Sequence, residues 1–144
     1  MTAAEVVEKL PKSRSEYIQV CREFVQSYII QMAGRVRWVY ILNTKCQRVG
    51  AAVVTLDTQD DIHVGVSKCH PRDRFDRYIA LRKAIAKQRM LQPGWVDTSD
   101  KAGTLVRLER EGILHRRFET WGPTVDLLLH VVKGLEKQKQ EEKP

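Results

Sequence analysis

Arginine and lysine gather most densely between residues 68 and 89, where only Asp73 and Asp76 oppose them. Such groups bind phosphate oxygens, and each one that approaches a nucleic-acid backbone releases condensed counterions. We predict that this segment contacts phosphate, although an exposed helix face with Asp73–Arg77 pairing would have the same composition. The candidate contacts in the segment are Lys68, Arg72, Arg74, Arg77, Lys83 and Lys87.

A second basic group, free of acidic residues, runs from Arg35 to Arg48. Arg35, Arg37 and Arg48 are its candidate phosphate contacts, and the aromatic residues interleaved with them are of the kind that stack bases. A tryptophan in a strand is nonetheless more often part of the core. We therefore expect an outer strand face with Arg35, Arg37, Val39 and Ile41, and an inner face with Trp38, Tyr40 and Leu42.

Residues that bind metals or act as nucleophiles are present, but their spacing is not that of a known site. Cys69 and His70 are adjacent, and His63 and Cys46 are available to join them, yet there is no CxxC or HxxxH pair. Cys69, His70 and Asp73 supply the residue types of a catalytic triad without implying its geometry. We therefore predict no metal and no cofactor.

Three further carboxylates, those of Asp57, Asp60 and Asp61, lie close together in the sequence. They have the chemistry to bind Mg²⁺, but a turn between two strands also favours such residues. The sequence contains no glycine-rich phosphate loop, no GxSxG and no HExxH. We predict no catalytic residue, and an enzyme whose site is assembled from distant residues stays an alternative.

The composition is that of a basic globular protein. The chain has 144 residues and a formal net charge of +7, with 42% hydrophobic and 30% charged residues. A positive excess favours polyanionic partners. The lack of a long apolar run or signal peptide and the odd number of cysteines predict a soluble intracellular protein, cytoplasmic or, in a eukaryote, nuclear, with no membrane partner.

The elements that must position the basic residues follow from periodicity. We predict a short helix before Pro11, a helix over 14–33 ended by Gly34, and strands over 36–42, 51–56 and 62–66. The strand connections are too short for a crossover helix, so the strands should form an antiparallel meander.

The second half of the chain is predicted to be mainly helical. Pro71 should begin a helix over 71–90, a further helix should open at 97–100 and end at Gly112, and 113–119 should be a strand or an extended segment. A last helix from residue 122 should bury one apolar stripe. The members of that stripe are Val125, Leu128, Leu129, Val132 and Leu135.

These elements predict an α+β fold: a three-stranded antiparallel meander with helices packed on one face and a helical C-terminal part. We expect a single globular domain over 1–135. Residues 136–144 have no apolar anchor and should form a disordered charged tail.

Short segments resemble known proteins. The run from Val64 to Phe75, with Ile79-Ala80 beyond it, is similar to small uncharacterised bacteriophage proteins. The stretch Thr104–Glu119 resembles the recognition helix and wing of winged-helix domains, which implies that Arg107 and Arg110 face DNA and that Arg116 and Arg117 lie on the wing. The order of a helix, three strands and a helix is similar to that of double-stranded-RNA-binding domains.

Together these features predict a non-catalytic protein that binds DNA or RNA through phosphate contacts, without base readout. The alternative is a protein-interaction module, such as a regulator or inhibitor that docks on an acidic surface of a larger complex. Charge alone does not choose between phosphate and carboxylate partners, and it leaves the oligomeric state open.

Overall fold

The computed structural model describes residues 13–114 and 122–141. Its antiparallel sheet has four strands in the order β1-β2-β3-β4, so the predicted α+β class and the meander are confirmed, and a short fourth strand is added. The predicted helix before Pro11 and residues 115–119 lie outside the described residues. The elements are α2 (Arg14–Gln31), β1 (Val36–Leu42), β2 (Arg48–Leu56), β3 (Ile62–Lys68), α3 (Arg77–Ala86), β4 (Arg89–Met90), α4 (Lys101–Arg110) and α5 (Gly122–Glu141).

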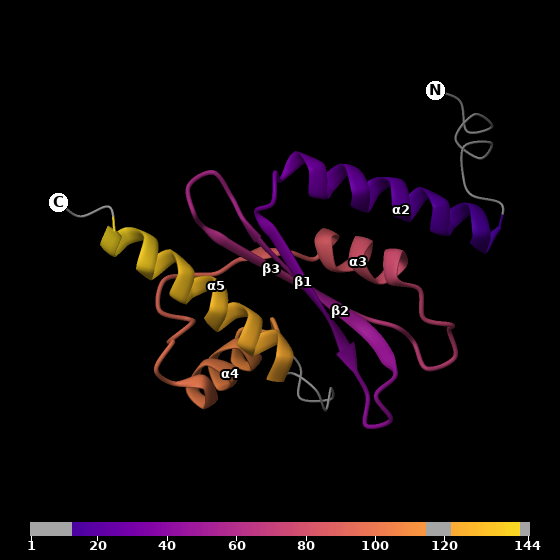
Figure 1. Cartoon of the computed structure of the whole chain (residues 1–144). Helices are drawn as coiled ribbons and strands as arrows, with labels where there is room; N and C mark the ends of the chain where they lie inside the picture. The colour runs from indigo at the N-terminus through magenta and orange to yellow at the C-terminus, as the bar shows by residue number, and fades with distance from the viewer. Residues whose placement is uncertain (1–12, 115–121, 142–144) are drawn as a thin grey trace.

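Helices cover both faces of the sheet (Figure 1). Side chains alternate along a strand, so Val53 and Val54 of β2 point to opposite faces, and both are 1% exposed. Val53 packs in the cluster beneath α2 and α3, and Val54 packs in the cluster beneath α4 and α5. The helical C-terminal part, which the sequence did not place, therefore covers the second face.

The first face brings α3 very close to β3. Gly65 lies directly beneath the helix, where an added Cβ would be 1.8 Å from the carbonyl oxygen of Ala84. The buried Ser67 hydroxyl donates a hydrogen bond of 2.7 Å to the carbonyl of Ala80. A glycine in the strand and alanines in the helix together allow the two backbones to approach.

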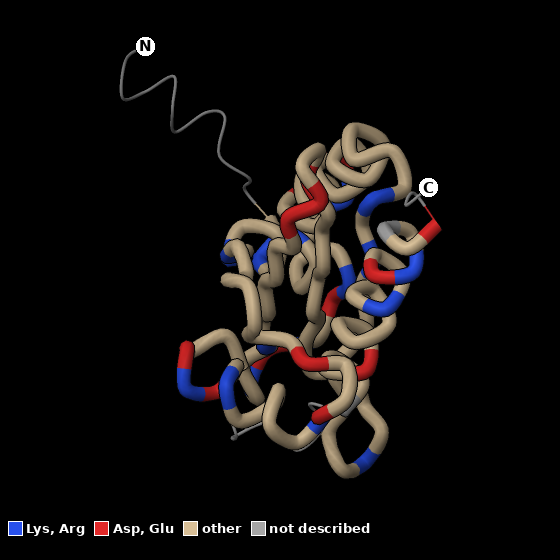
Figure 2. Tube along the Cα trace, turned by 90° about the vertical axis from the view of Figure 1, so that its left-hand side faces the viewer, with Lys and Arg blue, Asp and Glu red and all other residues tan. Residues whose placement is uncertain are grey.

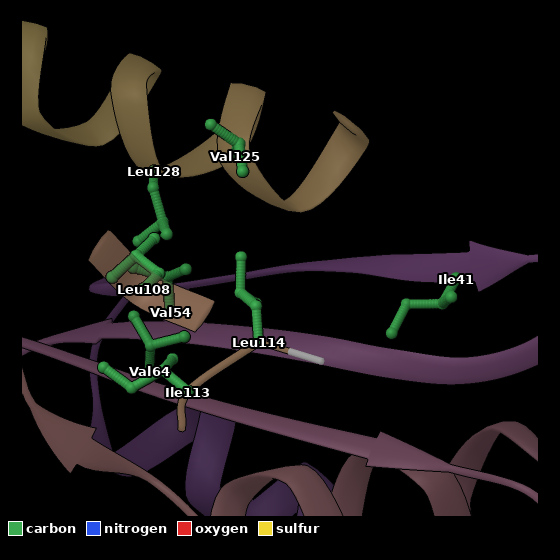
Figure 3. Packing of buried hydrophobic residues seen from close by; sticks show 8 residues of the cluster. All are labelled: Ile41, Val54, Val64, Leu108, Ile113, Leu114, Val125 and Leu128. Carbon is green, nitrogen blue, oxygen red and sulfur yellow. The ribbon is translucent and has the colours of Figure 1, made fainter. Parts of the chain in front are cut away.

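On the second face, α4 and α5 enclose the other core cluster. Figure 3 shows Leu128 of α5 extending toward the sheet with Leu108 of α4 beside it, and Val125 farther along α5 belongs to the same cluster. All three side chains are 0% exposed. The first two members of the predicted stripe are thus fully buried, its other three members are partly buried, and the helix packs across β1 and β2.

The prediction of one helix over 71–90 is wrong at both ends. The helix begins at Arg77, because the side chain of Asp76 caps it by accepting hydrogen bonds from the amides of Tyr78 and Ile79. At the other end, Arg89–Met90 pair with β3 as β4. Pairing of these two residues with β3 is a long-range contact, and the helical spacing of apolar residues in the sequence carries no information about it.

The predicted faces of β1 need correction as well. Ile41, expected on an outer face, is 1% exposed, while Trp38, expected in the core, is 38% exposed. Helix α5 covers the face that was taken as solvent-facing, which accounts for the burial of Ile41. Trp38 lies on the opposite face of the strand. Tyr40 is half-buried against the other cluster, as expected.

Helix α5 continues to Glu141, through residues 136–141 that we expected to be disordered. Glutamate, lysine and glutamine are good helix formers, so the helix propagates beyond its buried stripe without further apolar contacts. Among the described residues, no helix is both long enough and apolar enough to cross a bilayer.

Candidate nucleic-acid interface

The β1–β2 turn, the β3–α3 connection and the start of α2 lie at one end of the molecule, on the right in Figure 1; we call this the loop end. Hydrogen bonds hold its parts together. The amide of Cys69 donates to the carbonyl of Val49 at 2.6 Å, and the guanidinium of Arg14 donates to the carbonyl of Arg74. The connection is therefore fixed against both the sheet and α2.

Within the connection, the polar groups of residues 69–73 bond mainly to backbone. The Cys69 thiol is 3.3 Å from the carbonyl oxygen of Asp73, and His70 Nδ1 accepts a 3.1 Å hydrogen bond from the amide of Arg72. These bonds shape a turn and do not form a relay from carboxylate to imidazole to thiol. Among the described residues, no group of three His, Cys, Asp or Glu side chains is placed to hold a metal ion.

A groove of about 540 Å³ separates the β1–β2 turn from the β3–α3 connection. Its lining combines apolar and polar side chains. The apolar lining is Ile41, Leu42, Val49, Pro71 and Phe75, and the polar lining is Asn43, Gln47, Arg48, Lys68, Cys69, His70 and Asp73. Size and lining both suit an organic ligand group.

The Asn43 side chain gives the turn beside the groove its shape. Its carbonyl oxygen accepts hydrogen bonds of 2.9 Å from the amides of Lys45 and Gln47, and its amide nitrogen donates to Gln47 Oε1. A side chain that satisfies the turn backbone in this way leaves Arg48 at a defined position where β2 begins. Cys46, at a φ of 60°, completes the turn.

A smaller cationic pocket of about 220 Å³ lies between the start of α2 and the start of α3. The cations in its lining are Arg14, Lys68, Arg74 and Lys83. Tyr17 lines it too, and burial, with the neighbouring Cys21 thiol, raises the pKa of this phenol above its ordinary value. The groove and the cationic pocket share part of their walls, including Lys68, His70 and Phe75.

Two carboxylates belong to the described lining of the cationic pocket, those of Asp73 and Asp76. Asp76 already accepts two amide hydrogen bonds as the cap of α3, at 2.9 and 3.0 Å. One oxygen of that carboxylate is therefore committed to the helix, which limits how far it can compete for the neighbouring cations.

Aromatic rings and guanidinium groups stack beside the groove. The guanidinium carbon of Arg48 lies 4.4 Å from the ring centre of Tyr40, and Tyr40 meets Phe75 edge to face at 6.0 Å. On α3, the guanidinium carbon of Arg77 lies 4.6 Å from the ring centre of Tyr78. Contact with a ring face restrains these cations without neutralising their charge.

Basic residues continue from the loop end along the edge of β3. A hollow of about 210 Å³ there, which we call the edge hollow, is lined by Lys68, Lys87 and Arg89 together with Ile113. Lys68 lies at the meeting point, since it lines this hollow, the groove and the cationic pocket. The exposed Arg72 belongs to the loop end as well.

The structure does not place Arg35 and Arg37 with the other candidates. They lie where β1 begins, and Arg48 lies beyond its far end, so the seven-residue strand of about 20 Å separates them. Arg35 donates to the carbonyls of Leu56 and Asp57 at 3.2 and 2.6 Å and pairs with Asp60. Its charge thus secures the β2–β3 turn.

The carboxylates of that turn also stabilise it. Asp57 accepts hydrogen bonds from the amides of Gln59 and Asp61, and its second oxygen lies 3.0 Å from His63 Nε2. These contacts, led by the one to His63, lower the pKa of Asp57. Hydrogen bonds to Asp57 and the ion pair between Asp60 and Arg35 therefore stabilise this turn.

Figure 2 shows this end of the molecule, where acidic and basic residues are mixed along the trace.

Of the cations that the winged-helix resemblance implicates, Arg107 points inward. Its guanidinium donates to the carbonyl of Trp95 at 3.3 Å and to the Thr104 hydroxyl at 3.2 Å. Arg110 is exposed at the end of α4, and Arg116 and Arg117 lie outside the described residues.

Sequence reasoning missed several residues of the loop end, namely Arg14, Tyr17, Asn43, Gln47 and Phe75. Arg14 begins a helix more than fifty residues before the connection it contacts, so no local pattern signals it.

Comparison with known proteins found no relative of this chain. No protein-family model matches it, and neither a curated protein nor a solved structure shows significant similarity to it.

Proposed function

We propose that this protein binds nucleic acid without catalysis and that the loop end contacts the phosphate backbone. The observation that carries the proposal is the convergence of cations from separate segments on adjoining hollows. Arg14 comes from α2, Arg48 from β2, Lys68 from β3, and Arg74 and Lys83 from the connection and α3. Folding these like charges together costs free energy, which an anionic ligand would offset.

Phosphate suits this arrangement better than the carboxylates of a protein partner. Guanidinium groups supply fixed forks for phosphate oxygens, and a polyphosphate chain presents charges at regular spacing along a track. The cations from Arg48 through Lys68 to Lys87 and Arg89 follow such a track around the end and edge of the sheet. Contacts of this kind do not distinguish one base sequence from another.

A salt titration with matched variants tests the proposal. The loop-end double variant Arg74→Ala/Lys83→Ala and the control Arg110→Ala/Lys133→Ala remove equal charge from exposed positions. Binding to labelled DNA or RNA is measured by fluorescence anisotropy over a range of salt. Each lost phosphate contact should lower the magnitude of the log–log slope by about 0.7 on single strands and about 0.9 on duplex DNA.

We expect the salt dependence of the loop-end variant to be weaker by the equivalent of about two phosphate contacts, and that of the control to equal the wild-type value. Absence of binding to any nucleic acid at low salt would overturn the proposal. An equal loss in both variants would show that the loop end is not the contact surface. If a pull-down recovers the same partner protein with and without nuclease, docking on an acidic protein replaces nucleic-acid binding as the function.

A further inference from the structure

We infer that the loop end takes an unstacked nucleotide of a single strand, with its base in the groove and a phosphate in the cationic pocket. This inference rests on the proposed function and specifies the kind of nucleic acid. The step beyond charge is the shape of the surface, which is hollowed where the cations meet. A surface suited to the outside of a duplex needs cations but no recess that includes apolar side chains.

The groove provides what a single base requires. Its volume of about 540 Å³ is ample for a base with its sugar, and its lining includes the apolar side chains of Leu42, Val49 and Phe75. Bases in a duplex are covered above and below by their neighbours, so their faces cannot enter such a recess. A base that has left the stack regains the lost contacts on an apolar or aromatic wall.

Phe75 and Arg48 stand where a base would stack. Phe75 is half-buried, lines both the groove and the cationic pocket, and is held by its edge contact with Tyr40. The Arg48 guanidinium carbon lies 4.4 Å from the centre of the Tyr40 ring, a contact that restrains its position, and Arg48 lines the same groove. A planar cation and a phenyl ring that border one recess are a stacking platform that tolerates any base.

The phosphate position follows from the wall that the two hollows share. Phe75, Lys68 and His70 line both, so a ligand can cross from the groove to the cationic pocket over them. A sugar separates base from phosphate in every nucleotide, and this wall separates the apolar recess from the cluster of Arg14, Arg74 and Lys83. A free nucleotide shares this chemistry, but the basic track beyond Lys68 favours a unit within a longer strand.

The test compares three ligands at one salt concentration: an oligothymidylate, its blunt duplex with oligoadenylate, and thymidine monophosphate. The proteins are wild type, Phe75→Leu, Phe75→Trp and a control, Phe24→Leu, whose ring is 42% exposed on α2 and lines neither hollow. Thermal unfolding verifies that each variant is folded. Phe75→Trp keeps an aromatic wall should Phe75→Leu prove unstable.

We expect wild type to bind the single strand more tightly than the duplex, and Phe75→Leu to weaken single-strand binding about 5- to 150-fold, as for one lost base stack. Phe75→Trp and Phe24→Leu should bind like wild type, and duplex binding should not change in any variant. Equal losses on single strand and duplex, or tighter duplex binding by wild type, would overturn the inference while leaving nucleic-acid binding intact. Monophosphate binding as tight as that of the strand would assign the site to free nucleotides instead. If wild type binds neither the single strand nor the duplex, the proposed function itself is refuted.

Discussion

Replacing Gly65 by alanine should destabilise the protein severely, because α3 lies directly on β3 at this residue. The new Cβ would be 1.8 Å from the carbonyl oxygen of Ala84 and 2.8 Å from the amide nitrogen of Gln88. Both neighbours are backbone atoms of the helix region, so no side chain can rotate away. Ordinary contact begins at 3.4 Å, and α3 must therefore retreat by about 1.5 Å.

The magnitude follows from what that retreat breaks. Overpacking a close-packed interface costs about 1–3 kcal/mol, and a shift of the helix also weakens the buried hydrogen bond from Ser67 to Ala80, which contributes about 1 kcal/mol. We expect the free energy of unfolding to fall by about 3 kcal/mol or more. For a chain of this length the melting temperature should drop by roughly 10 °C.

Urea denaturation followed by circular dichroism measures the effect, and Gly134→Ala is the matched control. Gly134 lies in α5, and an added Cβ there meets nothing within 4 Å. That change should stabilise the helix by about 0.5–1 kcal/mol. If Gly65→Ala stays within 1 kcal/mol of wild type while Gly134→Ala behaves as expected, the close approach of α3 to β3 is refuted.

Other changes probe the remaining parts of the fold. Asp76→Ala should lower the free energy of unfolding by about 1 kcal/mol, because it removes the cap of α3, whereas Asp76→Asn should keep most of that stabilisation. Urea midpoints measure both variants, and equal losses would contradict the capping role. Leu108→Ala should cost about 2–5 kcal/mol, since the side chain is 0% exposed between α4 and the sheet; a cost below 1 kcal/mol would mean that this core is loosely packed. The pKa of Asp57 is lower in the folded chain than its ordinary value of 3.8, so its contribution is present above pH 4 and is lost as the pH falls through the folded pKa. Urea midpoints against pH should therefore decline more steeply at acid pH for wild type than for Asp57→Asn, and identical profiles would exclude the contribution.

The elements were predictable where their signals are local. Helix α2 begins at the predicted residue 14, where the hydroxyl of the cap residue Ser13 accepts a hydrogen bond from the amide of Glu16 at 3.2 Å. The strand β1 has the predicted bounds, and Gly112 adopts the expected positive φ of 74° after α4. Capping and glycine conformations depend on a few neighbouring residues, which is why a single sequence reveals them.

Which faces are buried was not predictable from the same patterns. Ala51, Ala52, Val53 and Val54 are all buried, because helices cover β2 on both sides. An uninterrupted apolar run signals burial on two faces, but it does not say which helices provide it. The face that carries Ile41 was taken as solvent-facing for that reason.

The sequence by itself determined the α+β class, the meander and the excess of cations between residues 68 and 89. Tertiary structure decided which cations meet: it separated Arg35 and Arg37 from Arg48 by the length of β1, and it brought Arg14 to the β3–α3 connection. The physical reason is that charge density is a property of the chain, whereas convergence depends on strand register and helix docking. Both are set by long-range contacts such as the one between α3 and Gly65.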